Sequence, residues 1–182
     1  LCIGRGIIGV TPNMLSIWDV DTETLLRDAT ENMKKNYPVE FTSVVDLLIR
    51  EYKKKAEDEN NIMREDIKDL VDQLTMVSTS DRQMYVLTNE RHNLGASTIL
   101  YPDTLSKVGS VLNSDFYLLP SSIHEIIIVP DNGYVDEEAM NNMIRSVNSE
   151  HLAPHEILSD QMYLYHRVNQ VLEPIGSMAI GA

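Results

Sequence analysis

Two segments in the first half of the chain carry apolar residues at helical spacing. In residues 21–35 they are Leu25, Leu26, Ala29 and Met33. Asp21 precedes this stripe, where a helix N-cap belongs. Residues 62–76 show a similar stripe with charged residues on the opposite face. The pattern therefore predicts one helix over 21–35 and another over 62–76.

Three neighbouring segments have different patterns. Residues 7–11 predict a strand that Pro12 ends, because proline cannot donate a hydrogen bond to a sheet ladder. Residues 39–52 begin with β-branched residues and continue with leucines, which predicts a strand followed by a helix. Residues 53–61 are highly charged and lack large apolar side chains, so we expect a solvated linker or turn there.

The second half of the chain repeats one order of elements: strand, turn, strand, Pro-Asp and helix. The two copies have strands at 84–88 and 96–101, and at 116–119 and 124–129. Each copy then has an aspartate that can cap a helix, Asp103 or Asp136. The helices should bury Leu105, Val108, Val111 and Leu112 in the first copy, and Met140, Met143, Ile144 and Val147 in the second. This order predicts a duplicated strand–strand–helix unit.

Strands joined by short turns pair as antiparallel neighbours, and the helices between them must cover an apolar sheet face. We therefore expect an α+β fold, with a mainly antiparallel sheet and amphipathic helices on one face. A last strand is expected at 161–166, and the apolar run 126–129 indicates a central strand covered on both sides. We expect a single domain over residues 1–182, with 84–166 as its best-defined core.

Composition and charge narrow the classes of function. The 182 residues are 43% hydrophobic, enough for a packed core, and 15 Lys and Arg face 28 Asp and Glu. The net charge of −13 argues against nucleic acid and anionic membranes as partners. Cys2 is the single cysteine, which fits a reducing cytoplasm. The chain begins at Leu1 rather than Met, so we expect a fragment that lacks its natural N-terminus.

The first motif that suggests chemistry is the GxGxxG pattern of residues 4–9. A dinucleotide-binding loop needs a strand before these glycines and a helix that begins at the last one, so that backbone N–H groups can hold a pyrophosphate. Only three residues precede Gly4, and Gly9 is followed by Val-Thr-Pro. We therefore expect no bound cofactor.

Four residues of one turn form a candidate hydrolytic site: Ser121, Ser122, His124 and Glu125. Nucleophilic catalysis needs a serine beside a histidine base, with a carboxylate that orients the histidine. In a strand, however, His124 and Glu125 would point to opposite faces. A turn shaped by hydrogen bonds between the serine hydroxyls and the backbone explains the same residues.

A metal site is the second chemical candidate, with His124, His151, His155 and Asp160 as ligands. Imidazole and carboxylate groups suit zinc and similar ions, and His151 and His155 have the spacing of one helix face. Pro154 lies between them and belongs only in the first turn of a helix. We therefore expect surface histidines rather than a metal centre.

Five short segments of the sequence resemble those of a known family. They are MYVLTN (84–89), LYPDTL (100–105), NSDFYLLPSSIHE (113–125), VPD (129–131) and APHEILSDQMYLY (153–165). The chain resembles the domain of unknown function 5688, which is common in Gram-positive gut bacteria, over most of residues 7–166. It departs from the family in residues 53–81 and after His166.

The resemblance implies a bacterial protein with no established activity, so it supplies no catalytic residue. We expect an uncharacterised cytoplasmic protein that acts as a non-catalytic binding or protein-interaction module. Its ligand is unknown, and a protein partner or a homo-oligomer fits this expectation. The alternative is a hydrolase or a metal-assisted enzyme that uses the neighbourhood of Ser122, His124, His151, His155 and Asp160.

Overall fold

A computed structural model describes residues 2–3, 6–58, 83–120 and 122–175. The chain divides into two compact units, Leu1–Pro38 and Val39–Ala182, where the sequence pattern favoured one domain. Every buried apolar side chain among the described residues lies between Val86 and Tyr165, inside the 84–166 segment.

The first unit is short and has little interior. It contains strands β1 (Cys2–Ile3) and β2 (Gly6–Ile7), which pair antiparallel, and helices α1 (Pro12–Trp18) and α2 (Thr22–Asn36). The helix predicted at 21–35 is confirmed, and Asp21 caps it by accepting a hydrogen bond of 2.7 Å from the Thr24 N–H. No described residue of either helix is buried.

The strand predicted at 7–11 is wrong. β2 ends at Ile7, and Pro12 begins α1 instead of ending a strand. Proline suits the first helical turn, because the N–H that it lacks would have no partner within the helix there.

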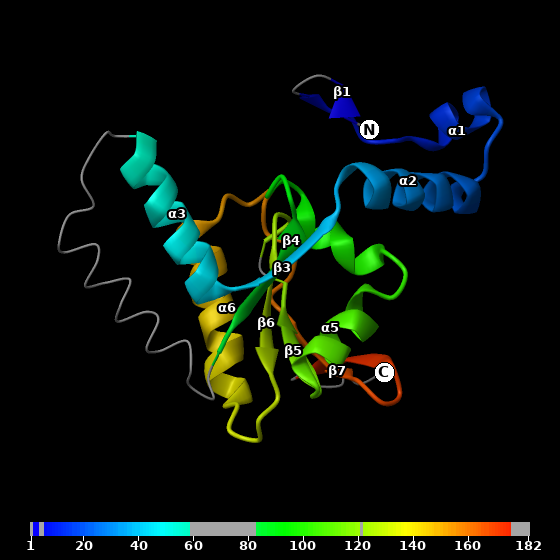
Figure 1. Ribbon diagram of the computed structural model, residues 1–182. Coiled ribbons are helices and arrows are strands. Elements are labelled where there is room, and N and C mark those ends of the chain that lie inside the picture. Colours follow the sequence, from blue (N-terminus) through cyan, green and yellow to red (C-terminus); the bar gives the residue numbers. More distant parts are fainter. Residues whose placement is uncertain (1, 4–5, 59–82, 121, 176–182) are drawn as a thin grey trace. The chain divides into compact units, whose positions relative to one another are not determined.

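The second unit is built on a six-stranded sheet. Its strands are β3 (Val39–Ser43), β4 (Tyr85–Asn89), β5 (Phe116–Leu119), β6 (Ile126–Pro130), β7 (Met162–His166) and β8 (Val171–Ile175). They lie in the order β3-β4-β6-β5-β7-β8, and every neighbouring pair is antiparallel. The predicted α+β class with a mainly antiparallel sheet is therefore confirmed (Figure 1).

Both faces of this sheet carry apolar side chains, because residues alternate along each strand. Phe116 and Leu118 of β5 face one core cluster, while Tyr117 and Leu119 face another. The first cluster packs against η1 (Gly95–Leu100) and α5 (Thr104–Leu112), and the second packs against α6 (Glu137–His151).

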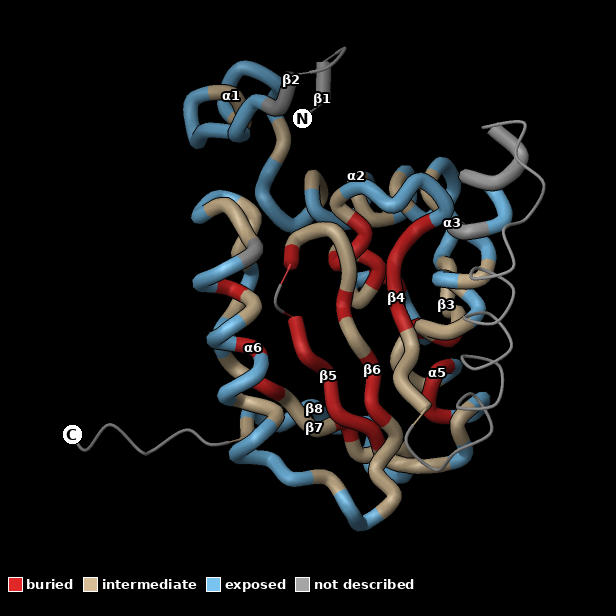
Figure 2. The backbone as a smooth tube through the Cα atoms, turned by 90° about the vertical axis from the view of Figure 1, so that its left-hand side faces the viewer, coloured by how far each residue is buried: buried red, intermediate tan, exposed pale blue. Residues whose placement is uncertain are grey.

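Helices therefore cover both faces of the sheet, and the expectation of helices on one face is wrong. Helix α3 (Val44–Asp58) lies on the same side as α6 (Figure 1). Figure 2 shows the buried residues concentrated in the strands between these layers. The central strand β6 is covered on both sides, as its apolar run indicated.

The predicted duplication lacks one strand. Residues 95–100 form the 3₁₀ helix η1 where a strand was expected at 96–101. Two local hydrogen bonds stabilise this turn, from the Ser97 hydroxyl to the Leu94 carbonyl and from the Thr98 hydroxyl to the Gly95 carbonyl. Such side-chain bonds compete with sheet pairing, and they explain why β-branched residues fail to form a strand here.

The positions of α5 and α6 agree with the sequence pattern, but one predicted cap and two predicted buried residues do not. Asp136 caps α6 with a bond of 3.0 Å from the Ala139 N–H, whereas Asp103 makes no side-chain cap for α5. Val111 and Met143, both expected in the core, are exposed. The strand at 124–129 begins later than expected, since β6 starts at Ile126.

The segment 39–52 forms β3 and the start of α3, as predicted. Helix α3 continues through Asp58, so residues 53–58 are helical where a charged linker or turn was expected. Residues 59–61 and the helix predicted at 62–76 lie outside the described residues. Within the described ranges, none of the helices has the length and apolar character needed to cross a membrane.

Candidate ligand-binding pocket

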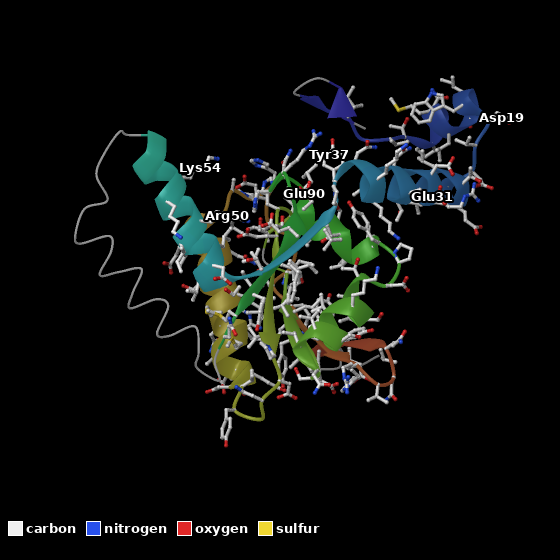
Figure 3. The ribbon with its side chains drawn as sticks, viewed as in Figure 1. Asp19, Glu31, Tyr37, Arg50, Lys54 and Glu90 are labelled. Atoms are coloured by element: carbon white, nitrogen blue, oxygen red, sulfur yellow. The ribbon has the colours of Figure 1, made fainter. Side chains whose placement is uncertain are left out.

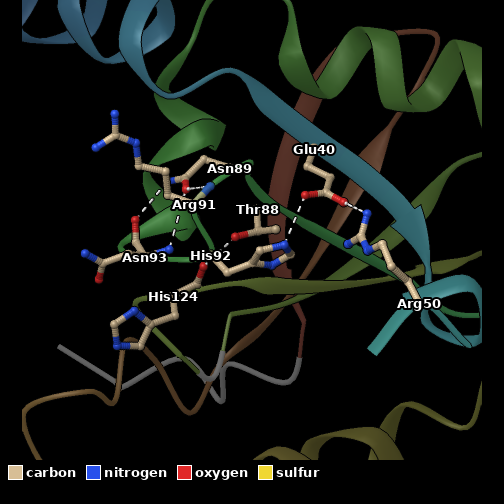
Figure 4. Close-up of polar contacts among 8 residues, drawn as sticks. All are labelled: Glu40, Arg50, Thr88, Asn89, Arg91, His92, Asn93 and His124. Atoms are coloured by element: carbon tan, nitrogen blue, oxygen red, sulfur yellow. Dashed lines mark hydrogen bonds and ion pairs between the residues drawn. The ribbon is translucent and has the colours of Figure 1, made fainter. Parts of the chain in front are cut away.

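Charged side chains meet where β3, α3 and the turn after β4 come together. Glu40 on β3 points away from the core that its neighbour Phe41 joins. Its Oε1 lies 2.5 Å from Nη1 of Arg50 on α3, and its Oε2 lies 3.2 Å from Nε2 of His92 (Figure 4). The Glu40 side chain is only 17% exposed, so both of its oxygens are committed to these two partners.

The turn that carries His92 is held by the buried Asn89 at the end of β4. The Asn89 Oδ1 accepts hydrogen bonds from the Arg91 and Asn93 N–H groups at 3.0 and 3.5 Å, and its Nδ2 donates to the Asn93 carbonyl at 2.8 Å. His92 has a left-handed backbone with φ of 50°. Asparagine often organises such turns, and here it fixes the approach of His92 to Glu40.

A pocket of about 480 Å³ opens beside this cluster. It is lined by Val39, Glu40, Arg50, Lys54, Glu90 and His92, and we call it the β3–α3 pocket. Figure 3 shows Arg50 and Lys54 on α3 and Glu90 beyond the end of β4. Lys54 and Glu90 are exposed, and neither forms an ion pair within the described part of the chain.

A second hollow of about 430 Å³ adjoins the first along α3. It is lined by Asp46, Ile49, Arg50, Lys53 and Lys54, so it shares Arg50 and Lys54 with the β3–α3 pocket. Guanidinium and ammonium groups are the side chains that hold carboxylates and phosphates most strongly. The second hollow, with Arg50, Lys53 and Lys54 against Asp46, is therefore locally cationic on a chain whose net charge is −13.

The hydrolytic candidates are arranged as a structural turn. The buried Ser122 Oγ accepts a hydrogen bond of 3.0 Å from the His124 backbone N–H, and thus meets the main chain of His124 rather than its ring. The ring Nδ1 accepts from the Leu94 N–H at 3.1 Å, and Nε2 lies 3.7 Å from Oε1 of Glu156. Ser121 lies outside the described residues. Glu125 is half-buried just before β6.

The metal candidates are distributed over separate contacts. Asp160 Oδ1 accepts a bond of 2.6 Å from Asn148 Nδ2, and His155 is exposed in the turn before Ile157. The side chain of His151 lies outside the described residues. Among the side chains that the structure does describe, no three histidine, cysteine, aspartate or glutamate groups stand together as ligands for an ion.

A second cluster around a histidine lies toward the opposite edge of the sheet, on β7, β8 and the residue before β5. His166 Nδ1 lies 3.0 Å from Oδ2 of Asp115, and Nε2 lies 3.5 Å from Oε2 of Glu173. The hydrogen bond to Asp115 raises the pKa of His166. The pKa of Asp115 is lowered, chiefly because its Oδ1 accepts a bond of 2.9 Å from the Arg167 N–H.

Sequence reasoning missed the residues of the β3–α3 pocket because they come from three separated segments. Lys54 was part of the charged run 53–61, which looked like a solvated linker. Glu40 carried the one available signal, since it is the single charged residue in the strand Val39–Ser43.

Comparison with known proteins found no significant match among curated proteins or solved structures. One family model matches, over residues 3–167. This span covers the first unit from residue 3 and the second unit through strand β7, and it includes every residue of the β3–α3 pocket. The chain belongs to this family of unknown function, domain of unknown function 5688.

Proposed function

We propose that this protein is a non-catalytic binding module that holds a small carboxylate-bearing ligand in the β3–α3 pocket. The observation that carries the proposal is the Lys54 ammonium, which stands beside Arg50 in the pocket wall without an ion-pair partner among the described residues. Arg50 already pairs with Glu40, so of the two cations that line this pocket, Lys54 is the one without an ion pair in the described part of the chain.

Binding is favoured over hydrolysis by the hydrogen bonds of the alternative site. A serine nucleophile needs a histidine ring nitrogen to take its proton. The Nδ1 of His124 instead accepts from the Leu94 backbone, and the Ser122 hydroxyl accepts from the His124 backbone. These bonds support a role in shaping the turn, and Ser122 and His124 do not form the hydroxyl-to-ring pair that a nucleophilic serine needs.

The proposal places this binding module in the bacterial cytoplasm. A single cysteine supports a reducing compartment, and the acid excess disfavours nucleic acid and anionic lipid as ligands. The ligand is instead recognised by local charge. A carboxylate that reaches Lys54 also meets the outer N–H groups of Arg50, whose side chain is 50% exposed.

Titration followed by NMR of the ¹⁵N-labelled full chain tests this function. We expect two carboxylate probes, dialanine and N-acetyl-dialanine, to shift the amide signals of residues 39–41 and 90–93 in a saturable way. Lys54→Met should weaken binding about 3- to 10-fold, as expected for loss of one partly exposed charged contact. Lys107→Met on α5, at the other sheet face, is the matched control. Absence of saturable shifts with both probes, or equal affinity of Lys54→Met, overturns the proposal.

A further inference from the structure

We infer that the ligand of the β3–α3 pocket is a small zwitterion, which carries a carboxylate and an ammonium group in one molecule. This inference rests on the proposed function and deepens it, because it specifies a second charge on the ligand. It follows from how the charges of the pocket are divided between paired and unpaired groups.

The pocket lining contains two cations and two carboxylates, together with His92. Glu40 accepts from Arg50 through one oxygen and faces His92 through the other, so its charge is compensated inside the protein. The remaining two groups are Lys54 and Glu90. Each is exposed, and the structure gives neither an ion-pair partner in the described ranges.

Lys54 and Glu90 belong to different walls of the pocket. Lys54 stands on α3 beside Arg50, and Glu90 begins the turn beyond β4 that Asn89 holds through hydrogen bonds (Figure 3). A ligand in the pocket therefore meets an open cation from one wall and an open anion from the other. Charge complementarity therefore favours a ligand that carries both a positive and a negative group.

Ligands with one charge fit this arrangement less well. A simple carboxylate satisfies Lys54 but brings a like charge toward Glu90, and a simple amine satisfies Glu90 but faces Lys54 and Arg50. Such like-charge contacts add to the discrimination against the wrong ligand. The two cations and two carboxylates of the lining balance in formal charge, which matches a ligand with no net charge.

The size of the site suits a ligand of a few residues. A volume of about 480 Å³ lies within the range of about 300–1,000 Å³ that is usual for small-molecule sites. The adjoining hollow, which shares Arg50 and Lys54, leaves space for a substituent on the ligand. Amino acids and short peptides with free ends have this size and both charges.

Four dialanine derivatives test the inference in the same NMR titration: the free dipeptide, its N-acetyl form, its C-terminal amide and the doubly blocked form. We expect free dialanine to bind at least about threefold more tightly than N-acetyl-dialanine, with the amide and the blocked form weaker still. Glu90→Gln should remove the preference for free dialanine over its N-acetyl form. Glu138→Gln, an exposed carboxylate on α6, is the matched control and should keep it.

The outcomes separate this inference from the function on which it rests. Equal, Lys54-dependent affinities for dialanine and N-acetyl-dialanine would overturn the zwitterion and leave the carboxylate site standing. A preference for dialanine that survives Glu90→Gln would also overturn the role given to Glu90. If neither carboxylate probe gives saturable shifts, the proposed function fails and the zwitterion fails with it.

Discussion

Gly95 occupies a position where even one added methyl group should destabilise the second unit. It begins η1 where this turn passes the end of β4 and the loop before β6. A Cβ atom at Gly95 would overlap the Thr88 Oγ1, and it would lie 2.5 Å from the His124 carbonyl oxygen and 2.8 Å from the Asn89 nitrogen. Two of these three atoms are backbone, so a change of rotamer cannot relieve the overlap.

We expect Gly95→Ala to lower the free energy of unfolding by about 2–4 kcal/mol. Overpacking of a tight interior usually costs about 1–3 kcal/mol. The Thr88 hydroxyl, which donates to the His124 carbonyl at 2.8 Å, must also move, and loss of such a bond costs about 1 kcal/mol. For a slope of about 2 kcal/mol per molar urea, the midpoint of unfolding should fall by about 1–2 M.

Gly109→Ala supplies the matched control for urea unfolding followed by circular dichroism. Gly109 is also buried, but the nearest atom to its Cβ would be the Arg167 Cγ at 3.0 Å, in a flexible side chain. Alanine inside a helix gains up to about 1 kcal/mol over glycine, so this variant should match or exceed the wild type in stability. A midpoint for Gly95→Ala within about 0.3 M of the wild type would refute the packing argument.

Three further predictions concern hydrogen bonds in the second unit. Asp136→Ala removes the cap of α6 and should lower the free energy of unfolding by about 1 kcal/mol in the same assay, whereas an unchanged midpoint would contradict this role. Asn148→Ala removes buried bonds to the Ser159 carbonyl and Asp160 and should lower it by about 1–3 kcal/mol; a loss below about 0.5 kcal/mol would argue against these bonds. Asp115→Asn should destabilise the protein more at pH 5.5 than at pH 8.5. The raised pKa of His166 contributes stability that is fully present below pH 6.5 and is lost as the pH rises through the pKa of the folded state. The lowered pKa of Asp115 contributes stability that is present above pH 3.8 and is lost only in acid. Equal destabilisation at both pH values would count against this pair.

Elements with strong local signals could be predicted from the sequence. Helices α2 and α6 combine an apolar stripe with an aspartate cap, and β5 and β6 are short apolar runs between turn residues. Two local errors share a cause, because one residue type suits two structures. Pro12 can end a strand or begin a helix, and Thr98 can join a sheet or bond to the carbonyl three residues earlier.

The arrangement of these elements in space was less predictable. Helices on both faces of the sheet follow from the alternation of Phe116 and Tyr117 toward two different clusters, but all four residues of β5 are apolar, so no pattern reveals the alternation. The β3–α3 pocket depends on Glu40, Arg50 and His92, which are brought together by pairing of β3 with β4 across more than forty residues. A single sequence, taken by itself, gives no sign of that pairing.

The edge strand β8 affects whether separate molecules can associate by pairing their sheets. Strand β8 lies at the end of the strand order and contains Pro174, which pairs in register with Tyr163. Proline is tolerated at such a position because the N–H that it lacks would face outward from an edge strand. A strand from another molecule would miss one hydrogen bond there, so Pro174 disfavours extension of the sheet along β8.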